Sequence, residues 1–85
     1  MQVTVKLFAT LRQEAGWSEQ VVELADGATV GELLQQLTHA YPALRLTERT
    51  VYAAVNLAYV QVDHRLVSEE VIAIFPPVSG GSAGR

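Results

Sequence analysis

Apolar and polar residues alternate near the start of the chain, in the pattern of a half-buried β-strand. Val3, Val5 and Leu7 fall on one side of an extended backbone, and the residues between them are polar. The last apolar run, residues 71–75, is rich in β-branched side chains and ends at two prolines, which cannot donate the hydrogen bonds of a sheet. Both segments are therefore predicted to be strands.

Three further segments are predicted to be extended. Residues 18–24 place Val22 and Leu24 on the inner side, and residues 50–55 and 59–62 are two more apolar runs bounded by turn-forming residues. The first two strands are close enough in sequence to form a hairpin with a loop of medium length. That loop is predicted to be a connection with room for a helical turn.

One amphipathic helix is predicted to begin at Thr29 and to end near residue 40. Thr29 and Glu32 form a capping box, in which each side chain accepts from the backbone N–H of the other residue. Pro42 prevents the helix from continuing. Four apolar residues share one face, which is predicted to pack against a sheet: Val30, Leu33, Leu34 and Leu37.

These elements predict an α+β fold of two layers. One main helix covers only one face of a sheet, so the simplest arrangement is a mixed sheet with that helix packed on one face. We expect the first strand to lie centrally, antiparallel to the second and parallel to the last, which is the ubiquitin-like β-grasp arrangement. Residues 1–77 are predicted to form the domain, and residues 78–85, which have a linker-like composition, to form a flexible tail.

Composition excludes several classes of function. The 85 residues include nine acidic and six basic side chains, and the basic ones are scattered, so nucleic acid is not an expected partner. The absence of cysteine excludes a disulfide, a thiolate zinc site and a persulfide carrier. No apolar stretch approaches the ~20 residues of a membrane span and no signal peptide is apparent, so a cytoplasmic protein without a membrane partner is expected.

The sequence contains no recognisable catalytic or metal site. His39 and His64 have no partner at helical spacing that would complete a metal site, and the adjacent Glu69 and Glu70 are expected to face water. No glycine-rich phosphate loop precedes the helix. We therefore expect neither a bound cofactor nor a metal.

The C-terminal segment is the remaining candidate for chemistry. Pro76 and Pro77 hold the chain extended after the last strand. Ser79 is followed by Gly80 and Gly81, which have no side chains to obstruct entry into a narrow channel. The segment from the first proline to the last glycine can reach ~20 Å at ~3.3 Å per residue. Composition alone is equally consistent with an ordinary frayed terminus.

Phe8 and Phe75 are predicted to lie on the outer face of the sheet. Successive side chains of a strand point to opposite faces, which places Phe75 opposite the buried isoleucines of its strand and Phe8 on the polar side of the first strand. Both rings would then be exposed beside the exit of the tail, where they and Pro76 and Pro77 are predicted to bind a partner. The alternative is that a loop covers both rings.

Three stretches of the sequence resemble one known family. They are AVN at residues 54–56, DHRL at residues 63–66 and VIAIFPPVSGG at residues 71–81. These stretches closely resemble the small subunit of molybdopterin synthase, the MoaD-type sulfur carrier. The opening is similar as well, with VKLFA at residues 5–9 and LRQEAG at residues 11–16. The ending FPPVSGG is the most specific part of the resemblance.

The resemblance implies a non-catalytic subunit whose reactive group is the carboxylate of Gly81. An E1-like adenylating enzyme would activate that carboxylate with ATP, and sulfur would replace the adenylate to give a thiocarboxylate. The tail would then enter the large subunit of molybdopterin synthase, where the sulfur passes to a pyranopterin precursor in molybdenum cofactor biosynthesis. ATP would be used by the activating enzyme and catalysis would lie in the large subunit.

The end of the chain departs from the family pattern. Ser82-Ala83-Gly84-Arg85 follows Gly81, so Gly81 has no free carboxylate as written. Four explanations remain open at this point. A protease removes these residues, or they belong to a longer fused chain, or they were added to the natural sequence, or the protein is not a working carrier.

Glu69-Glu70 is a second departure, at a turn where the family commonly has Gly-Asp. With glutamate in place of glycine, this turn is expected to avoid positive φ. The effect is expected on local shape rather than on function.

Two alternative functions also remain open. The first is a β-grasp module that binds a protein partner without sulfur transfer, which predicts that the tail stays blocked at Arg85 in the cell. The second is a sulfur carrier for another pathway, such as tRNA thiolation.

Overall fold

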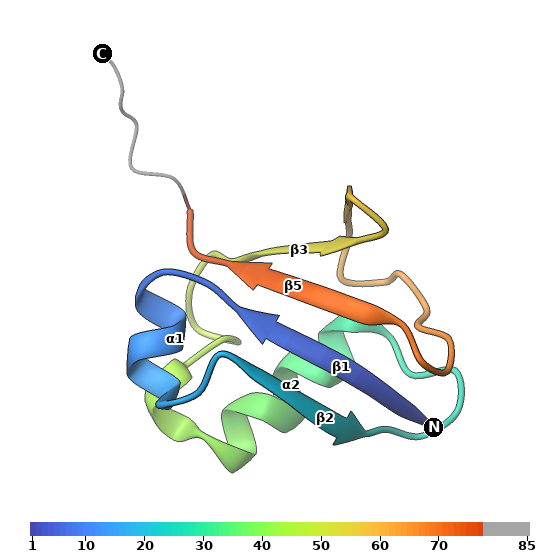
Figure 1. Ribbon diagram of the computed structural model, residues 1–85, viewed down its shortest axis with the longest axis horizontal. Helices are drawn as coiled ribbons and strands as arrows, with labels where there is room; N and C mark the ends of the chain where they lie inside the picture. Colours follow the sequence, from blue (N-terminus) through green and yellow to red (C-terminus); the bar gives the residue numbers. More distant parts are fainter. Residues whose placement is uncertain (78–85) are drawn as a thin grey trace.

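A five-stranded sheet with helices packed on one face makes up the part of the chain that the computed structural model describes, residues 1–77 (Figure 1). None of the helices in that part is long and apolar enough to cross a membrane. The strands are β1 (Gln2–Leu7), β2 (Glu19–Glu23), β3 (Tyr52–Val55), β4 (Ala58–Val60) and β5 (Val71–Phe75). The helices are α1 (Thr10–Ala15), α2 (Val30–Ala40) and the short 3-10 helix η1 (Pro42–Leu44).

The strand order is β2-β1-β5-β3-β4, with β1 inside the sheet. β1 pairs antiparallel with β2 and parallel with β5, and β5 pairs antiparallel with β3. The predicted central position of the first strand and the mixed sheet are therefore confirmed. The parallel pair joins the two ends of the described chain, with Val71 beside Thr4 and Ile74 beside Leu7.

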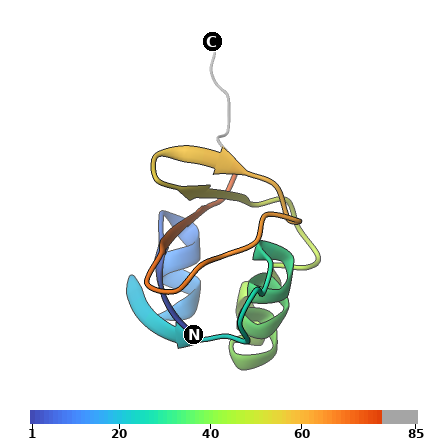
Figure 2. The same cartoon turned by 90° about the vertical axis from the view of Figure 1, so that its right-hand side faces the viewer.

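Helix α2 begins with the predicted capping box. The backbone N–H of Glu32 donates to Thr29 Oγ1 at 3.2 Å, and the backbone N–H of Thr29 donates to Glu32 Oε1 at 2.8 Å. Two more N–H groups of the first turn donate to the carbonyls of Val62 and His64. Figure 2 shows that segment running past the start of α2. The first turn of α2 thus has its backbone donors satisfied, as a stable helix start requires.

The core lies between the sheet and α2 and contains the residues that the alternation predicted. Ile72 and Ile74 have no exposed surface, and no polar residue of the described part is buried. From the remaining elements the core receives Val3, Val5, Leu7, Leu11, Val22, Val30, Leu33, Leu37, Leu44 and Leu66, among others. One face of β1, β2, β3 and β5 thus packs in the core, and the opposite face of the sheet is turned away from it.

The connection between β1 and β2 contains a helix of six residues rather than a single turn. α1 starts after Ala9, which has φ of 56° and provides no side-chain cap, so no sequence signal marks its beginning. It ends at Gly16 in the left-handed conformation, as helix ends often do. Leu11 is the one buried residue of this helix, and its packing in the core stabilises the helix in place of a cap.

The expectation that the turn at Glu69 avoids positive φ is wrong, because Glu69 has φ of 72°. Its backbone N–H donates to the carbonyl of Gln2 at 2.7 Å, and Glu70 Oε1 accepts from the N–H of Val67 at 2.9 Å. These two bonds hold the turn in a conformation that normally favours glycine. The turn therefore has positive φ at residue 69 although a glutamate and not a glycine stands there.

Candidate functional site

Four aromatic side chains meet on the outer face of the sheet, the face opposite α2. Phe8 and Phe75 stack with ring centroids 4.8 Å apart, Tyr59 meets Phe75 edge-on at 6.3 Å, and Tyr52 meets Tyr59 at 6.0 Å. Register brings them together: Tyr52 lies opposite Phe75, and the N–H of Phe8 donates to the carbonyl of Ile74. We call these four residues the aromatic cluster. Each such pair contributes about 0.5–1.5 kcal/mol beyond the burial of its area.

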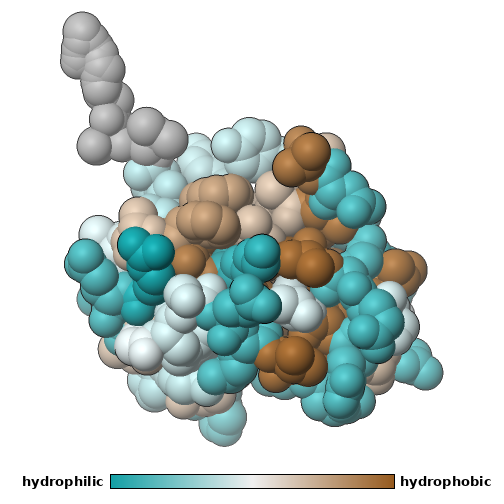
Figure 3. Space-filling view, viewed as in Figure 1, coloured by the Kyte–Doolittle hydropathy of each residue, from teal (hydrophilic) through white to brown (hydrophobic). Residues whose placement is uncertain are grey.

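The aromatic cluster is open to solvent. Tyr59 is 74% exposed, Tyr52 46% and Phe8 38%, while Phe75 is half-buried beneath its neighbours. Figure 3 shows apolar side chains distributed between polar ones over the exposed surface of the molecule. Exposed apolar groups gathered on one face mark a site of interaction with another molecule.

A groove of about 690 Å³ lies beside the aromatic cluster, and we call it the sheet groove. Its centre is lined by Ala54 and Ala73, which are opposite each other on β3 and β5. One wall is the tip of the β3–β4 hairpin, Asn56 and Leu57, and another is the turn at residues 68–70. A volume of this size is within the ~300–1,000 Å³ of ligand sites, but this groove is open along the sheet.

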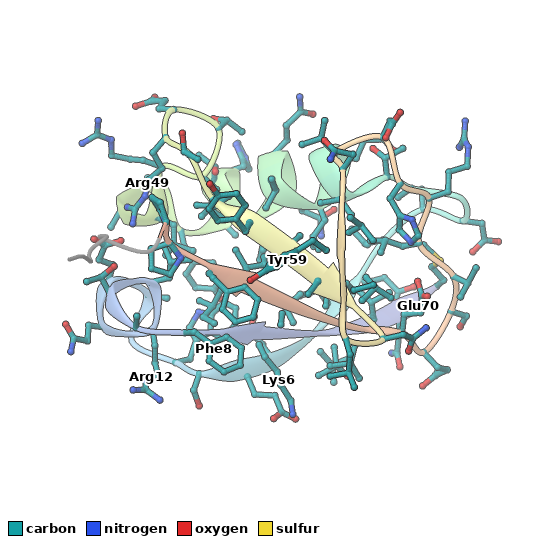
Figure 4. All side chains as sticks on the ribbon, turned by 90° about the horizontal axis from the view of Figure 1, so that it is seen from above. Lys6, Phe8, Arg12, Arg49, Tyr59 and Glu70 are labelled. Carbon is teal, nitrogen blue, oxygen red and sulfur yellow. The ribbon has the colours of Figure 1, made fainter. Side chains whose placement is uncertain are left out.

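Charges are unevenly distributed around the sheet groove. Lys6 projects from β1 into its lining, and the two carboxylates of Glu69 and Glu70 lie at the turn before β5. Figure 4 shows Glu70 at one end of the view and Arg12 and Arg49 towards the other. Arg49 is engaged in an ion pair with Glu14, at 2.8 Å. In the lining of the sheet groove, the basic side chain is therefore Lys6 on β1, and the acidic ones are Glu69 and Glu70 at the turn before β5.

The tail starts at the edge of this face. Pro76, half-buried, and Pro77, exposed, continue directly from Phe75. Ser79, Gly80 and Gly81 lie outside the described residues, and so do the residues of the predicted flexible tail. Predictions made for them therefore stay predictions, as does the proposed division between residues 77 and 78.

The structure places both predicted rings on the outer face, with Phe8 exposed as predicted but Phe75 half-buried, and it adds residues that sequence reasoning missed. Phe8 and Phe75 stack on each other on the outer face beside Pro76 and Pro77, and no loop within residues 1–77 covers Phe8. Tyr52, Tyr59 and Leu57 were missed, although alternation along β3 would have placed Tyr52 outward. Tyr59 could not be assigned a partner without the register between β3 and β4.

Among residues 1–77, no group of three or more His, Asp or Glu side chains lies close enough to hold a metal ion. His39 lies on α2, and His64 lies on the segment that passes the start of that helix. What the outer face does offer is apolar area, a concave centre and an asymmetric charge.

Comparison with known proteins gives consistent matches along the chain. The ThiS family matches residues 5–81. The molybdopterin synthase sulfur carrier subunit of Chlamydomonas reinhardtii is 42% identical over 83 residues, which cover 95% of this chain and 100% of the relative. The crystal structure of SAMP1 from Haloferax volcanii superposes with a TM-score of 0.83 at 30% identity, covering 95% of this chain and 100% of that one.

One solved complex also matches the fold. It contains subunits 1 and 2 of molybdopterin-converting factor from Helicobacter pylori, and the matching chain has a TM-score of 0.68 at 21% identity. The match covers 95% of this chain and 100% of that one.

Proposed function

This chain belongs to the ThiS family, and we propose that its Gly81 carries sulfur as a thiocarboxylate to a pyranopterin precursor in molybdenum cofactor biosynthesis. The proposal rests on the position at which the family match ends. The family match stops at Gly81, the second glycine of the pair, and the 42% identical relative, matched along its whole length, is named a molybdopterin synthase sulfur carrier subunit.

The chemistry requires a free carboxylate at Gly81 and no side chain in its way. A carboxylate is a poor electrophile, so an E1-like enzyme first joins it to AMP from ATP, releasing pyrophosphate. A sulfur nucleophile then displaces AMP and leaves a thiocarboxylate on the glycine. The absence of cysteine is compatible with this route, because the sulfur is held on the backbone and not on a side chain. Because activation consumes ATP, we place the carrier in the cytoplasm.

Ser82 to Arg85 must be absent from the active form on this proposal. The four residues lie beyond the family match, and they would carry the terminal carboxylate ~13 Å past Gly81 in an extended chain. Three of the four explanations are consistent with a working carrier: protease removal, a longer fused chain and residues added to the natural sequence. We propose protease removal, because it produces the active form from the sequence as it stands. Segments of small residues, such as Ser82-Ala83-Gly84, are common protease sites.

The proposed partner on the outer face is the large subunit of molybdopterin synthase. The Helicobacter pylori chain with the same fold was solved in a complex of subunits 1 and 2 of molybdopterin-converting factor, and this supports the proposed partner. In this chain the tail leaves directly from Phe75, so a protein that takes up the tail also meets the aromatic cluster. The adenylating enzyme has to receive the same tail and is therefore expected to use the same face.

Reconstituted transfer is the test of the proposal. The chain ending at Gly81 is mixed with the E1-like enzyme, ATP, a sulfur donor, the large subunit and the pyranopterin precursor. We expect dithiolene product in proportion to the carrier supplied, and none when ATP is omitted, because the carboxylate is then not activated. Product formation without this chain would contradict the proposal.

Phe75→Ala is expected to weaken binding to the large subunit strongly. Truncation of a central aromatic anchor costs ~2 kcal/mol or more, which is roughly 30-fold in Kd. Calorimetric titration measures the Kd, and the melting temperature should fall by no more than ~8 °C, the shift for a loss of ~1 kcal/mol in a small domain. The matched control is Val21→Ala, since Val21 is 59% exposed and lies outside the groove lining. Collapse of the melting transition would mean that Phe75 is a core residue.

A second candidate function is protein modification. The chain is 33% identical to the small archaeal modifier protein 1 of Haloferax volcanii, and its fold matches SAMP1 closely. Intact-mass analysis separates the candidates: a carrier is found with one oxygen replaced by sulfur, and a modifier is found attached to other proteins. A module that only binds its partner would show neither product.

A further inference from the structure

Lys6 is the only lysine of the sequence, and it lies close to the root of the tail. On the sheet it is opposite Ala73 of β5, two residues before Phe75. With neighbouring strands ~4.8 Å apart and ~3.3 Å per residue, the Cα atoms of Lys6 and Phe75 are about 8 Å apart. Lys6 is exposed and lines the sheet groove. Its amine is therefore on the outer face, next to the strand from which the tail continues.

The amine of Lys6 differs from the other amine of the structure, the α-amino group of Met1. None of the ion pairs among residues 1–77 includes Lys6, although Glu19 stands opposite it on β2. The α-amino group donates to the carbonyl of Leu24 at 2.7 Å and to Glu23 Oε2 at 3.1 Å. The hydrogen bond to the Glu23 carboxylate raises the pKa of this α-amino group, which favours its protonated form. Since only a neutral amine is a nucleophile, Lys6 is the better placed of the two.

The number of residues in the tail allows Gly81 to reach Lys6 of the same chain. If Pro76 and Pro77 led directly away from Lys6, they would add ~6.6 Å and place residue 77 about 15 Å from it. The four residues 78–81 cover ~13 Å, and the four methylenes of the lysine side chain cover the rest. A reactive group on so short a linker has an effective concentration on the order of millimolar. Reaction within one chain is therefore favoured over reaction between chains in dilute solution.

We propose that Lys6 is an acylation site for Gly81 of the same chain, which closes through an isopeptide bond when no sulfur replaces the adenylate. This inference rests on the proposed function, which supplies the adenylate of Gly81. After the adenylate leaves the activating enzyme, Lys6 Nζ attacks the carbonyl carbon of Gly81 and a C–N bond forms. The bond from that carbon to the phosphate oxygen of AMP breaks, AMP leaves with the bonding electron pair, and an amine proton passes to water. No oxidant or reductant is required.

The closed chain cannot carry sulfur. Its Gly81 carbonyl is part of an amide, which no longer has a carboxylate for the activating enzyme. The tail is also tied across the outer face, past the stacked rings of Phe8 and Phe75. The supply of sulfur therefore decides between two products of one adenylate, the thiocarboxylate and the closed chain.

Activation without a sulfur donor is the experiment that tests this. The chain ending at Gly81 is incubated with the E1-like enzyme and ATP, with pyrophosphate release as the measure of activation and intact mass as the measure of product. We expect a species lighter than the original chain by one water, with fragment spectra that join Gly81 to the peptide containing Lys6. Its yield should not fall when the released adenylate is diluted, because both reacting groups belong to one chain. Addition of the sulfur donor should replace this species by the thiocarboxylate.

Lys6→Arg is expected to lose the closed species completely when compared at equal pyrophosphate release, since a guanidinium keeps the charge but is not a nucleophile. The matched control combines Lys6→Arg with Arg65→Lys and so keeps the composition of the original chain. Arg65 donates to the carbonyl of Gly27, which follows β2, and the last residues of β2 lie beside the start of β1. The moved amine is therefore at the end of the sheet opposite the tail, and we expect no closed species from this control.

Each outcome has a distinct meaning. If the original chain releases no pyrophosphate, the proposed function fails and this inference with it. If pyrophosphate is released and only the free carboxylate is recovered, Lys6 is not an acylation site and only this inference is overturned. A species of twice the mass less one water would place the acceptor on a second copy and overturn closure within one chain. A closed species from Lys6→Arg would assign the reaction to another nucleophile and also overturn it.

Discussion

The chain that ends at Gly81 is expected to be adenylated and to gain sulfur, whereas the 85-residue chain is expected to keep its mass. The reason is positional. Both forms have a terminal carboxylate, but that of Arg85 lies ~13 Å farther along an extended chain and follows a long charged side chain. An activating site that receives glycine residues has no room for that side chain. Incubation with the E1-like enzyme, ATP and a sulfur donor, followed by intact-mass measurement, compares the two forms directly.

A chain ending at Gly84 is the matched control for this comparison. It also ends in glycine, but three residues, ~10 Å, beyond Gly81. If the position of the carboxylate is decisive, this control should remain unmodified although its terminal residue is the same. Equal conversion of all three forms would mean that the activating site accepts any terminus, and the assignment of Gly81 would be withdrawn.

Replacement of Gly81 by valine, in the chain ending at that residue, is expected to abolish sulfur transfer while the melting temperature stays unchanged. The β-branched side chain would widen the tail next to the reacting carbon. A misplacement of only ~1 Å can cost ~100-fold in rate, so we expect a loss of at least that size. The readout is the rate of thiocarboxylate formation by mass spectrometry, together with a thermal melt.

Two further variants separate a local effect from a general one. Gly81→Ala adds a single methyl group and should give an intermediate rate. Ala58→Val makes a small-to-valine change at an exposed position of β4, away from the tail, and should transfer sulfur normally. A Gly81→Val chain that supports full transfer would contradict the carrier function, because that function requires a reacting carboxylate with no side chain in its way.

Features that depend on residues close in sequence could be predicted. The capping box of Thr29 and Glu32 and the apolar stripe of α2 were confirmed, because both arise within one or two helical turns. Alternation identified the buried side of β1 and β5, and the outward direction of Phe8 and Phe75 followed from it. The role of Gly81 came from the resemblance of residues 71–81 to a known family, and because this residue lies outside the described part of the chain, it stays a prediction.

Features set by distant contacts could not be predicted. α1 has no capping side chain, and Leu11 anchors it in the core. The positive φ of Glu69 is stabilised by a hydrogen bond to the carbonyl of Gln2, at the other end of the chain. Propensity disfavoured this conformation, and a tertiary contact overrode it.

The sequence by itself determined the strands, the main helix, the side-chain directions along β1 and β5, and the tail that carries the proposed chemistry. The tertiary structure alone decided which outward side chains are neighbours. Lys6, Ala73, Ala54 and Tyr59 become one row only through the registers of three strand pairs. The physical reason is that alternation fixes the face of a residue, whereas a shift along the strand changes every cross-strand neighbour. The aromatic cluster and the sheet groove are therefore properties of the folded sheet and not of any one segment.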